Sequence, residues 1–506
     1  MKISPKAALS RPGTLILMLL GVALLLRLPL LNGSFWLDEA AQALESGRPL
    51  SQQFDIIPDF QPPLLHLVVH FLLFISAEEW WLRLGAALIP GLITIYVTYL
   101  VGKEVSSPKV GLLAAALLAT NSFHVFYSQE LRPYSLPALW AVVSWWCLLK
   151  LVKTPKLWPW WIGFTLVSIA GIYSSYLYPF LLLAQALGVL MYYRHRLAQV
   201  VAAVITTGLT FIPWLPVFRQ QLATGGLLRE QLPGWDAVVS SPQLKSLPLV
   251  IAKFLFGVID LKPSVFIIAS SLLLVTGLGY FLFHFFQQRQ QLLKPDPATK
   301  LLLLLILGSA VSLLGAWVIS FWVPVVQPKR VLFLLPIMYV VLVSIFEKVK
   351  SPRYLRQGVV GLLFILNITG LAAYYTQPSL QRENWRTLHL HLTSHYPASR
   401  TVAVFAFPEP FAPWRWYDQG TYQTMSIGYL SQPGMTFPRE SARKITEYEF
   451  VILFDYLTDL SDPQGLLIQE VEAFGYKGVE LLDYPGIGFV RVYARPGETL
   501  SYERGF

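Results

Sequence analysis

Charged residues are scarce in this chain. Asp, Glu, Lys and Arg make up 13% of its 506 residues, whereas a soluble domain carries about 25%. Hydrophobic residues make up 55% of the chain and gather in runs long enough to cross a bilayer. The composition therefore excludes an ordinary soluble protein and indicates an α-helical polytopic membrane protein.

Cysteine is almost absent as well, since Cys147 is the single one and lies within an apolar run. One cysteine excludes a disulfide framework and a cysteine-based metal site. The formal net charge is +10, but the basic residues fall in short loops between apolar runs and form no continuous basic face. This distribution argues against nucleic acid as a partner and marks membrane topology instead.

The basic loops predict the orientation, because loops rich in Lys and Arg stay in the cytoplasm. Lys2, Lys6 and Arg11 place the N-terminus there, and the first apolar run is expected as a retained span rather than a cleaved signal peptide. Arg27, near the outer end of that span, is expected to extend toward the interface. About eleven spans are predicted: Gly13–Leu31, Leu84–Val101, Val110–Tyr127, Leu136–Leu151, Leu157–Tyr173, Leu177–Tyr193, Ala198–Phe218, Ser264–Phe286, Leu301–Trp322, Val331–Phe346 and Gln357–Tyr375.

Two apolar runs, Pro62–Ile75 and Leu247–Val258, are predicted to remain on the outer face as interfacial or re-entrant helices. If Pro62–Ile75 crossed the membrane, every later basic loop would move outside. His66 and His70 lie four residues apart on this run, but no third ligand is near them in sequence, so no metal site is predicted.

The composition changes after Tyr375. We therefore expect a transmembrane domain over residues 1–376, with a first outer loop at 32–82, and a small extracytoplasmic α/β domain over 377–506. This last region contains no glycine-rich phosphate loop, zinc motif or Ser/His/Asp signature. Its patterns predict strands at Thr401–Phe405, Phe450–Phe454 and Phe489–Tyr493, and a helix over Pro463–Phe474 capped by Asp462.

An acidic pair, Asp38 and Glu39, follows the first span. Adjacent carboxylates at the mouth of a membrane segment are costly unless they face water, a cation or a substrate, so they mark a candidate site. An ordinary solvated loop is the alternative. Further along the expected outer face, Glu130 and Arg132 could form a local salt bridge, and the Lys329–Arg330 pair could contact lipid headgroups.

Several short motifs follow one another in a fixed order along the chain. They are Trp36-Leu37-Asp38-Glu39, Gln61-Pro62-Pro63-Leu64, Arg83-Leu84, Tyr127-Ser128-Gln129-Glu130-Leu131-Arg132-Pro133-Tyr134, Gln327-Pro328-Lys329-Arg330 with Leu335-Pro336, and Glu383-Asn384-Trp385-Arg386. In this order they resemble glycosyltransferase family 39, whose members use polyprenyl-phosphate-linked sugars and include protein O-mannosyltransferases and lipid A aminoarabinose transferases. The resemblance is strong over the first third of the chain and patchy beyond.

The resemblance implies a GT-C fold and transfer of a hexosyl or pentosyl group from a polyprenyl-phosphate donor to a lipid, glycan or protein acceptor. The reaction is expected at the outer face of a bacterial inner membrane. Asp38 is then the expected base, Glu39 its orienting neighbour or a ligand of a possible divalent cation, and Glu130 a second catalytic charge. The departing phosphate is expected to bind three cationic residues, Arg132, Lys329 and Arg330. The other expected substrate-binding residues are Tyr134, Gln61 and His66.

Two residues depart from the aminoarabinose transferases. Those enzymes typically have Lys before the Pro-Pro pair and an acidic residue near position 134, where this chain has Gln61 and Tyr134. Both differences argue against that particular acceptor.

Direct displacement with a single base would invert the anomeric centre, whereas a retaining route needs a nucleophilic carboxylate. Two other classes of function stay open. A transporter or flippase of lipid-linked glycans would place ionisable residues at mid-span, often with internal repeats. A catalytically inactive membrane scaffold would use the outer domain to bind partners.

Overall fold

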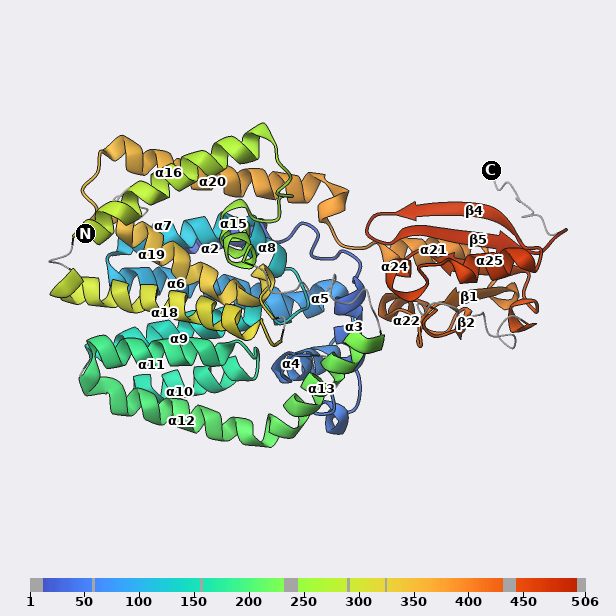
Figure 1. Ribbon diagram of the computed structural model, residues 1–506, viewed down its shortest axis with the longest axis horizontal. Helices are drawn as coiled ribbons and strands as arrows, with labels where there is room; N and C mark the ends of the chain where they lie inside the picture. Colours follow the sequence, from blue (N-terminus) through green and yellow to red (C-terminus); the bar gives the residue numbers. More distant parts are fainter. Residues whose placement is uncertain are drawn as a thin grey trace, which may run out of the picture. The chain divides into compact units, whose positions relative to one another are not determined.

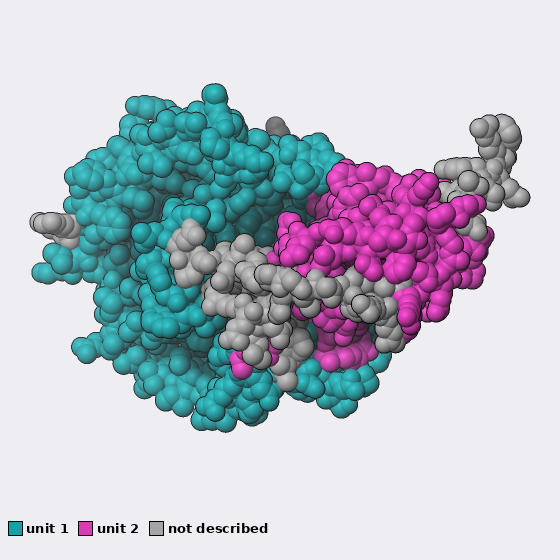
Figure 2. All heavy atoms as spheres, turned by 45° about the vertical axis from the view of Figure 1, so that its right-hand side comes forward, with its two compact units in different colours: residues 1–32, 49–222, 240–380 teal, residues 33–48, 223–239, 381–506 magenta. Residues whose placement is uncertain are grey.

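The computed structural model describes residues 12–56, 60–154, 158–231, 244–288, 292–323, 325–430 and 443–497. Lys2, Lys6 and Arg11, used above to orient the chain, lie outside these residues. The chain divides into two compact units, which Figure 2 distinguishes by colour. Unit 1 comprises residues 1–32, 49–222 and 240–380, and unit 2 comprises residues 33–48, 223–239 and 381–506.

Unit 1 is built from helices, and its long members run side by side (Figure 1). Among the described residues, seven helical stretches are long and apolar enough to cross a membrane. They are Glu79–Val105, Ser135–Lys153, Arg194–Gly225, Val265–Gln287, Pro297–Ile319, Pro328–Lys348 and Arg353–Thr376. Further apolar helices of ten to seventeen residues include α2 (Pro12–Leu25), α7 (Pro108–Thr120), α10 (Trp158–Ile172) and α11 (Tyr178–Tyr192). Helices therefore form at all eleven predicted spans, while the number that cross stays a prediction.

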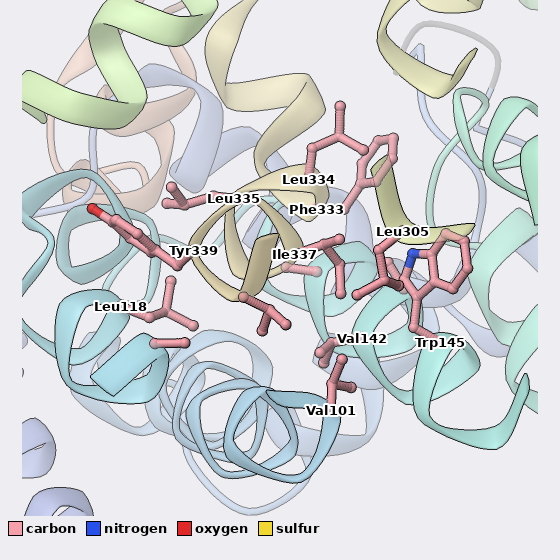
Figure 3. Close-up of a cluster of buried hydrophobic side chains, with 14 of the residues drawn as sticks. Val101, Leu118, Val142, Trp145, Leu305, Phe333, Leu334, Leu335, Ile337 and Tyr339 are labelled. Carbon is pink, nitrogen blue, oxygen red and sulfur yellow. The ribbon is translucent and has the colours of Figure 1, made fainter. Parts of the chain in front are cut away.

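The core of unit 1 surrounds α19 (Leu335–Lys348) and the short η5 (Pro328–Leu334) that precedes it. Figure 3 shows their side chains enclosed by apolar residues of four other helices. These helices are α6 (Ile89–Val105), α7, α9 (Ser135–Lys153) and α18 (Pro297–Ile319). Trp145 of α9 is 1% exposed and fills the space beside Gly308 of α18, where a Cβ would lie 2.3 Å from the indole. The core of unit 1 therefore forms where these helices meet.

The predicted span Val110–Tyr127 is divided at Asn121 into α7 and α8 (Ser122–Tyr127). The Asn121 side chain accepts a 3.0 Å hydrogen bond from the amide of His124 and so caps α8. Its amide nitrogen donates to the carbonyl of Phe254 and to the hydroxyl of Tyr339, both at 2.9 Å. The cap on His124 replaces one backbone hydrogen bond lost where the helix breaks, and the other two contacts satisfy the buried amide group of Asn121 itself.

The expectation for Arg27 was wrong, because its side chain turns into the protein. It is fully buried, and Nη1 donates to the carbonyls of Ala23 (2.8 Å) and Ala119 (3.1 Å). Nη2 donates to Nδ1 of His124 at 2.8 Å. Three acceptors inside the bundle therefore replace the headgroups to which a snorkelling arginine would reach.

The two runs predicted not to cross form the short helices α4 (Leu64–Leu73) and α15 (Ser246–Phe256). Ten and eleven residues fall well short of the roughly 20 that a bilayer requires. Their interfacial position stays a prediction.

Unit 2 contains a five-stranded sheet in the order β2-β1-β3-β5-β4. β1 pairs in parallel with β2 and β3, and β5 pairs antiparallel with β3 and β4. The three predicted strands are confirmed as β1, β3 and β5, while the more exposed β2 and β4 were missed. The strands are β1 (Thr401–Phe405), β2 (Gln423–Ser426), β3 (Phe450–Phe454), β4 (Lys477–Tyr484) and β5 (Gly488–Ala494).

Helices cover both faces of this sheet. One face packs on α21 (Trp385–His395) and α22 (Ala412–Asp418), and the other packs on α25 (Leu466–Ala473). Successive residues of β1 and β3 point to opposite faces, and every residue of both strands is buried; all of them except Thr401 are apolar. The predicted helix over Pro463–Phe474 begins later, at Leu466, with Gly465 at the N-cap position. The carboxylate of Asp462 nevertheless accepts hydrogen bonds from the first two amides of this helix, those of Leu466 (2.8 Å) and Leu467 (2.9 Å).

A close helix contact in unit 1 gives a test of the packing. A Cβ on Gly102 of α6 would lie 2.6 Å from the Cα of Gly111 in α7, so these helices meet backbone to backbone. Gly102→Ala is expected to lower the unfolding temperature of the purified protein, because overpacking costs about 1–3 kcal/mol. Gly279→Ala is the matched control, since no atom lies within 4 Å of its added Cβ. Equal unfolding temperatures for the two variants would contradict the packing described here.

Candidate active site

Asp38 and Glu39 lie in the first turn of α3 (Leu37–Ser46), which belongs to unit 2. Acidic residues are favoured at this position because the N-terminus of a helix carries partial positive charge. Asp38 is half-buried, whereas Glu39 is fully buried. The two adjacent carboxylates therefore have different environments.

The segment leading into α3 is held by residues of the C-terminal part of the chain. The amide of Phe35 donates to the hydroxyl of Tyr417 at 2.7 Å, and the Phe35 ring lies 5.5 Å from that of Trp416. The amide of Arg386 donates to Oγ of Ser34 at 3.1 Å. These contacts place the entrance of α3 against α21 and α22, an association that no local sequence pattern indicated.

Glu39 forms an ion pair with Arg382, with 3.5 Å between Oε2 and Nε. Their side chains are 0% and 6% exposed. This pair joins α3 to the segment just before α21. The geometry gives Glu39 an anchoring role, and the more exposed Asp38 is the better candidate to meet a substrate.

Glu383, two residues before α21, was noted in the sequence as part of a motif but was not assigned to the site. Its Oε2 accepts hydrogen bonds from the indole of Trp385 (2.6 Å) and the amide of Leu37 (3.2 Å). Its Oε1 accepts one from the hydroxyl of Tyr456 at 2.7 Å. Burial raises the pKa of Glu383 to about 7, and the negative charge of Asp38 raises it as well. The three hydrogen-bond donors act in the opposite direction and lower this pKa. The Glu383-Asn384-Trp385-Arg386 motif was the signal that could have identified this residue.

In unit 1, the turn between α8 and α9 carries Glu130, Arg132 and Tyr134. The amide of Arg132 donates to the carbonyl of Glu130, and the amide of Tyr134 to that of Arg132, both at 2.8 Å. Glu130 and Tyr134 are buried, and Arg132 is half-buried. This tight turn presents two oppositely charged side chains from one short segment.

Lys329 and Arg330 lie at the start of η5, and both are half-buried. The ammonium of Lys329 lies 5.7 Å from the centre of the Tyr134 ring, within the range of a cation–π contact. Since η5 packs on α9, the structure brings Tyr134 and Lys329 together from positions far apart in the sequence.

Gln61 and His66 also lie together, with 3.0 Å between their Nε2 atoms, and both are buried. Nε2 of Gln221 donates to the carbonyl of Gln61 at 3.2 Å. His70, four residues from His66, packs against the ring of Phe74 at 4.9 Å. In the described part of the chain, no group of three or more His, Cys, Asp or Glu residues could hold a metal ion.

Unit 2 contains a cavity of about 230 Å³ at the carboxyl ends of β1 and β3. Tyr456 lines it, together with Asp455 and Asp462. Asp455 is held by the guanidinium of Arg491 through Nη2 at 2.7 Å, and Asp462 accepts hydrogen bonds from the first two amides of α25. These acidic groups therefore serve the fold, and the cavity is not assigned to the site.

The environment of Glu39 predicts a structural effect that separates it from Asp38. Glu39→Gln is expected to lower the unfolding temperature markedly, because breaking a buried ion pair costs about 3–5 kcal/mol. Glu45→Gln on the same helix is the control, since Glu45 pairs with Arg48 near the surface and such pairs contribute about 0–1 kcal/mol. Thermal unfolding of the purified variants measures the difference. If Glu39→Gln were as stable as the control, the anchoring role would be refuted.

Residues 61–218 match the family model described as dolichyl-phosphate-mannose-protein mannosyltransferase. No curated protein sequence matches the chain.

Solved structures are similar over nearly the whole chain. ArnT from Cupriavidus metallidurans in the apo state has a TM-score of 0.55 at 11% identity, covering 95% of this chain and 98% of its own. The same protein bound to undecaprenyl phosphate has a TM-score of 0.53 at 11% identity, covering 95% and 97%. The Archaeoglobus fulgidus oligosaccharyltransferase tethered with an acceptor peptide has a TM-score of 0.52 at 12% identity, covering 94% and 74%.

These matches extend over both units, from the helical bundle into the C-terminal sheet. The apolar helices and the shared architecture identify an integral membrane protein. Its fold is GT-C, the fold of the polyprenyl-phosphate-dependent glycosyltransferases that it resembles.

Proposed function

We propose that this protein transfers a sugar from a polyprenyl-phosphate carrier to an acceptor on the extracytoplasmic face of the membrane, with Asp38 as the base. The observation that supports this most is the placement of Asp38. It is a half-buried carboxylate in the first turn of a helix whose entrance is fixed by several buried contacts. The likeness to ArnT bound to undecaprenyl phosphate supports the choice of carrier.

The reaction forms one bond and breaks another at the anomeric carbon. An acceptor hydroxyl attacks that carbon, its proton passes to the carboxylate of Asp38, and the bond to the phosphate oxygen breaks. The bonding electron pair leaves with the polyprenyl phosphate. A base in hydrogen-bond reach of the hydroxyl contributes about 10²–10⁴-fold to the rate. Displacement in one step inverts the anomeric configuration.

The departing phosphate gains negative charge and requires fixed cations nearby. We assign this role to Arg132, Lys329 and Arg330. The contact of Lys329 with Tyr134 orients its ammonium, and an arginine guanidinium matches the geometry of phosphate oxygens. Glu130, buried on the same turn as Arg132, is proposed as the second catalytic charge.

Gln61 and His66 are proposed to contact the substrate, and their mutual hydrogen bond fixes the orientation of the His66 ring. Glu39 would serve a divalent cation only at the expense of its pairing with Arg382. The proposal therefore assigns the chemistry to side-chain charges. The acceptor is a lipid, a glycan or a protein, and Gln61 and Tyr134 disfavour the acceptor of the aminoarabinose transferases. The proposed location is the bacterial inner membrane, with the C-terminal unit outside the cytoplasm.

Asp38→Asn tests the assignment of the base. This variant is expected to fold with an unchanged unfolding temperature and to lose at least about 100-fold in turnover, since the amide is unable to accept the proton. Release of undecaprenyl phosphate from undecaprenyl-phosphate-linked mannose, in solubilised membranes that supply the acceptor, measures turnover. Asp55→Asn, an exposed aspartate of the same outer loop, is the control. Undiminished turnover in Asp38→Asn would remove Asp38 from the mechanism.

Arg330→Ala tests whether Arg330 binds the phosphate. The ligand is undecaprenyl phosphate, so the identity of the donor sugar does not matter. The Kd for undecaprenyl phosphate is expected to rise about tenfold or more, because a hydrogen bond to a charged group contributes about 1.5–3 kcal/mol. Arg353→Ala, which removes an exposed arginine at the start of α20 (Arg353–Thr376), is the control. Equal affinities in the two variants would refute the phosphate-binding role of Arg330.

A further inference from the structure

The carboxyl group of Glu383 joins three separate parts of unit 2. Its donors are the backbone amide of Leu37 at the start of α3, the indole of Trp385 in α21, and the hydroxyl of Tyr456 just after β3. Leu37 directly precedes Asp38. Glu383 therefore holds the backbone of the residue that directly precedes the proposed base.

The space around Glu383 leaves its side chain little freedom. The turn between β4 and β5 passes over it at Gly486, which has φ +81°. A Cβ on Gly486 would lie 2.9 Å from Cγ and 3.1 Å from Cα of Glu383. Glycine is needed here both for the positive φ and for this close approach. The carboxyl group is consequently enclosed between α3, α21 and the sheet.

We propose that Glu383 is a positioning residue for Asp38. Glu383 ties the first turn of α3 to α21 and the sheet, and its own protonation changes the environment of Asp38. This inference rests on the proposed function of Asp38. Glu383 is the acidic residue of the Glu383-Asn384-Trp385-Arg386 motif, and the reaction proposed above gives it no role.

In the described part of the chain, Asp38 and Tyr456 are the titratable groups that act on the carboxyl group of Glu383. Asp38 adds repulsion from α3, and Tyr456 donates its hydrogen bond with a pKa raised by burial and by the charge of Glu383, so it stays neutral. Arg382, the preceding residue, pairs with Glu39. Burial and Asp38 both hold the pKa of Glu383 near 7 instead of its ordinary 4.5. The carboxyl group thus changes its charge close to neutral pH, beside the proposed base.

Two substitutions separate the charge of Glu383 from its position. Glu383→Gln keeps the shape, because the amide oxygen can accept from Leu37 and Trp385 while the amide nitrogen donates to the hydroxyl oxygen of Tyr456. It removes only the ionisation. Glu383→Ala removes all three hydrogen bonds, including the one from the amide of Leu37 at the start of α3. Asp459→Asn, at an exposed position in α24 (Thr458–Ser461), is the control.

The first measurement is thermal unfolding of the full-length protein as a function of pH. The folded protein retains the Glu383 proton up to about pH 7, whereas the unfolded chain releases it near 4.5, so this group's contribution to stability falls as the pH rises between these values. The wild type and Asp459→Asn are expected to lose stability over this range relative to Glu383→Gln. Parallel pH profiles for wild type and Glu383→Gln would overturn the protonation part of the proposal.

The second measurement is release of undecaprenyl phosphate from undecaprenyl-phosphate-linked mannose at pH 5.5 to 8.5. The wild type is expected to show a step near pH 7 that Glu383→Gln lacks. Glu383→Ala is expected to lower kcat at least tenfold, with the Kd for undecaprenyl phosphate within twofold of wild type. A purely structural role would not move the step in the Glu383→Gln profile.

Turnover of both variants equal to wild type at every pH would overturn the inference while leaving the role of Asp38 intact. An active Asp38→Asn variant would overturn the proposed function instead, and the unfolding data would still report the tie between Glu383 and α3. The two failures are therefore distinguishable.

Discussion

The structure depends on one constraint of the bilayer, which is that buried backbone groups must be hydrogen-bonded within the protein. Unit 1 satisfies it with helices, and at the break the side chain of Asn121 accepts the hydrogen bond of the His124 amide. The amide nitrogen of the same side chain donates to Phe254 and Tyr339 across the bundle. The same rule governs Arg27, whose guanidinium finds two backbone carbonyls and a histidine ring inside the protein. Polar groups in this bundle therefore also fix how its helices pack.

Outside the bundle, the fold of unit 2 explains how one acidic pair acquires two environments. Neighbouring residues in the first turn of a helix point about 100° apart, so Asp38 and Glu39 face different surroundings. Glu39 is directed to Arg382 and is buried, whereas Asp38 remains half-exposed beside Glu383. A carboxylate that is already paired serves the fold, and its neighbour remains suited to chemistry.

Much of the architecture follows from local patterns in the chain. Apolar runs predicted the helices at the eleven expected spans, and two shorter runs predicted the helices α4 and α15. Nearly continuous apolar runs predicted β1 and β3 with correct ends, because both faces of these strands are covered by helices. β2 and β4 were missed because their residues are largely exposed and carry no such run. The matched fold agrees with the family resemblance drawn from the sequence, while the roles of the site residues stay predictions.

The sequence by itself determined the membrane character of the protein, its helices, the inner strands of the sheet and the residues that resemble a glycosyltransferase site, since each depends on composition or on neighbours in the chain. Only the tertiary structure showed that residues 33–48 pack with the C-terminal unit, that Lys329 lies over Tyr134, and that Glu383 contacts the backbone of Leu37. The physical reason is sequence distance. Leu37 and Glu383 are 346 positions apart, and such a contact is decided by how separately formed elements pack, which no local pattern encodes.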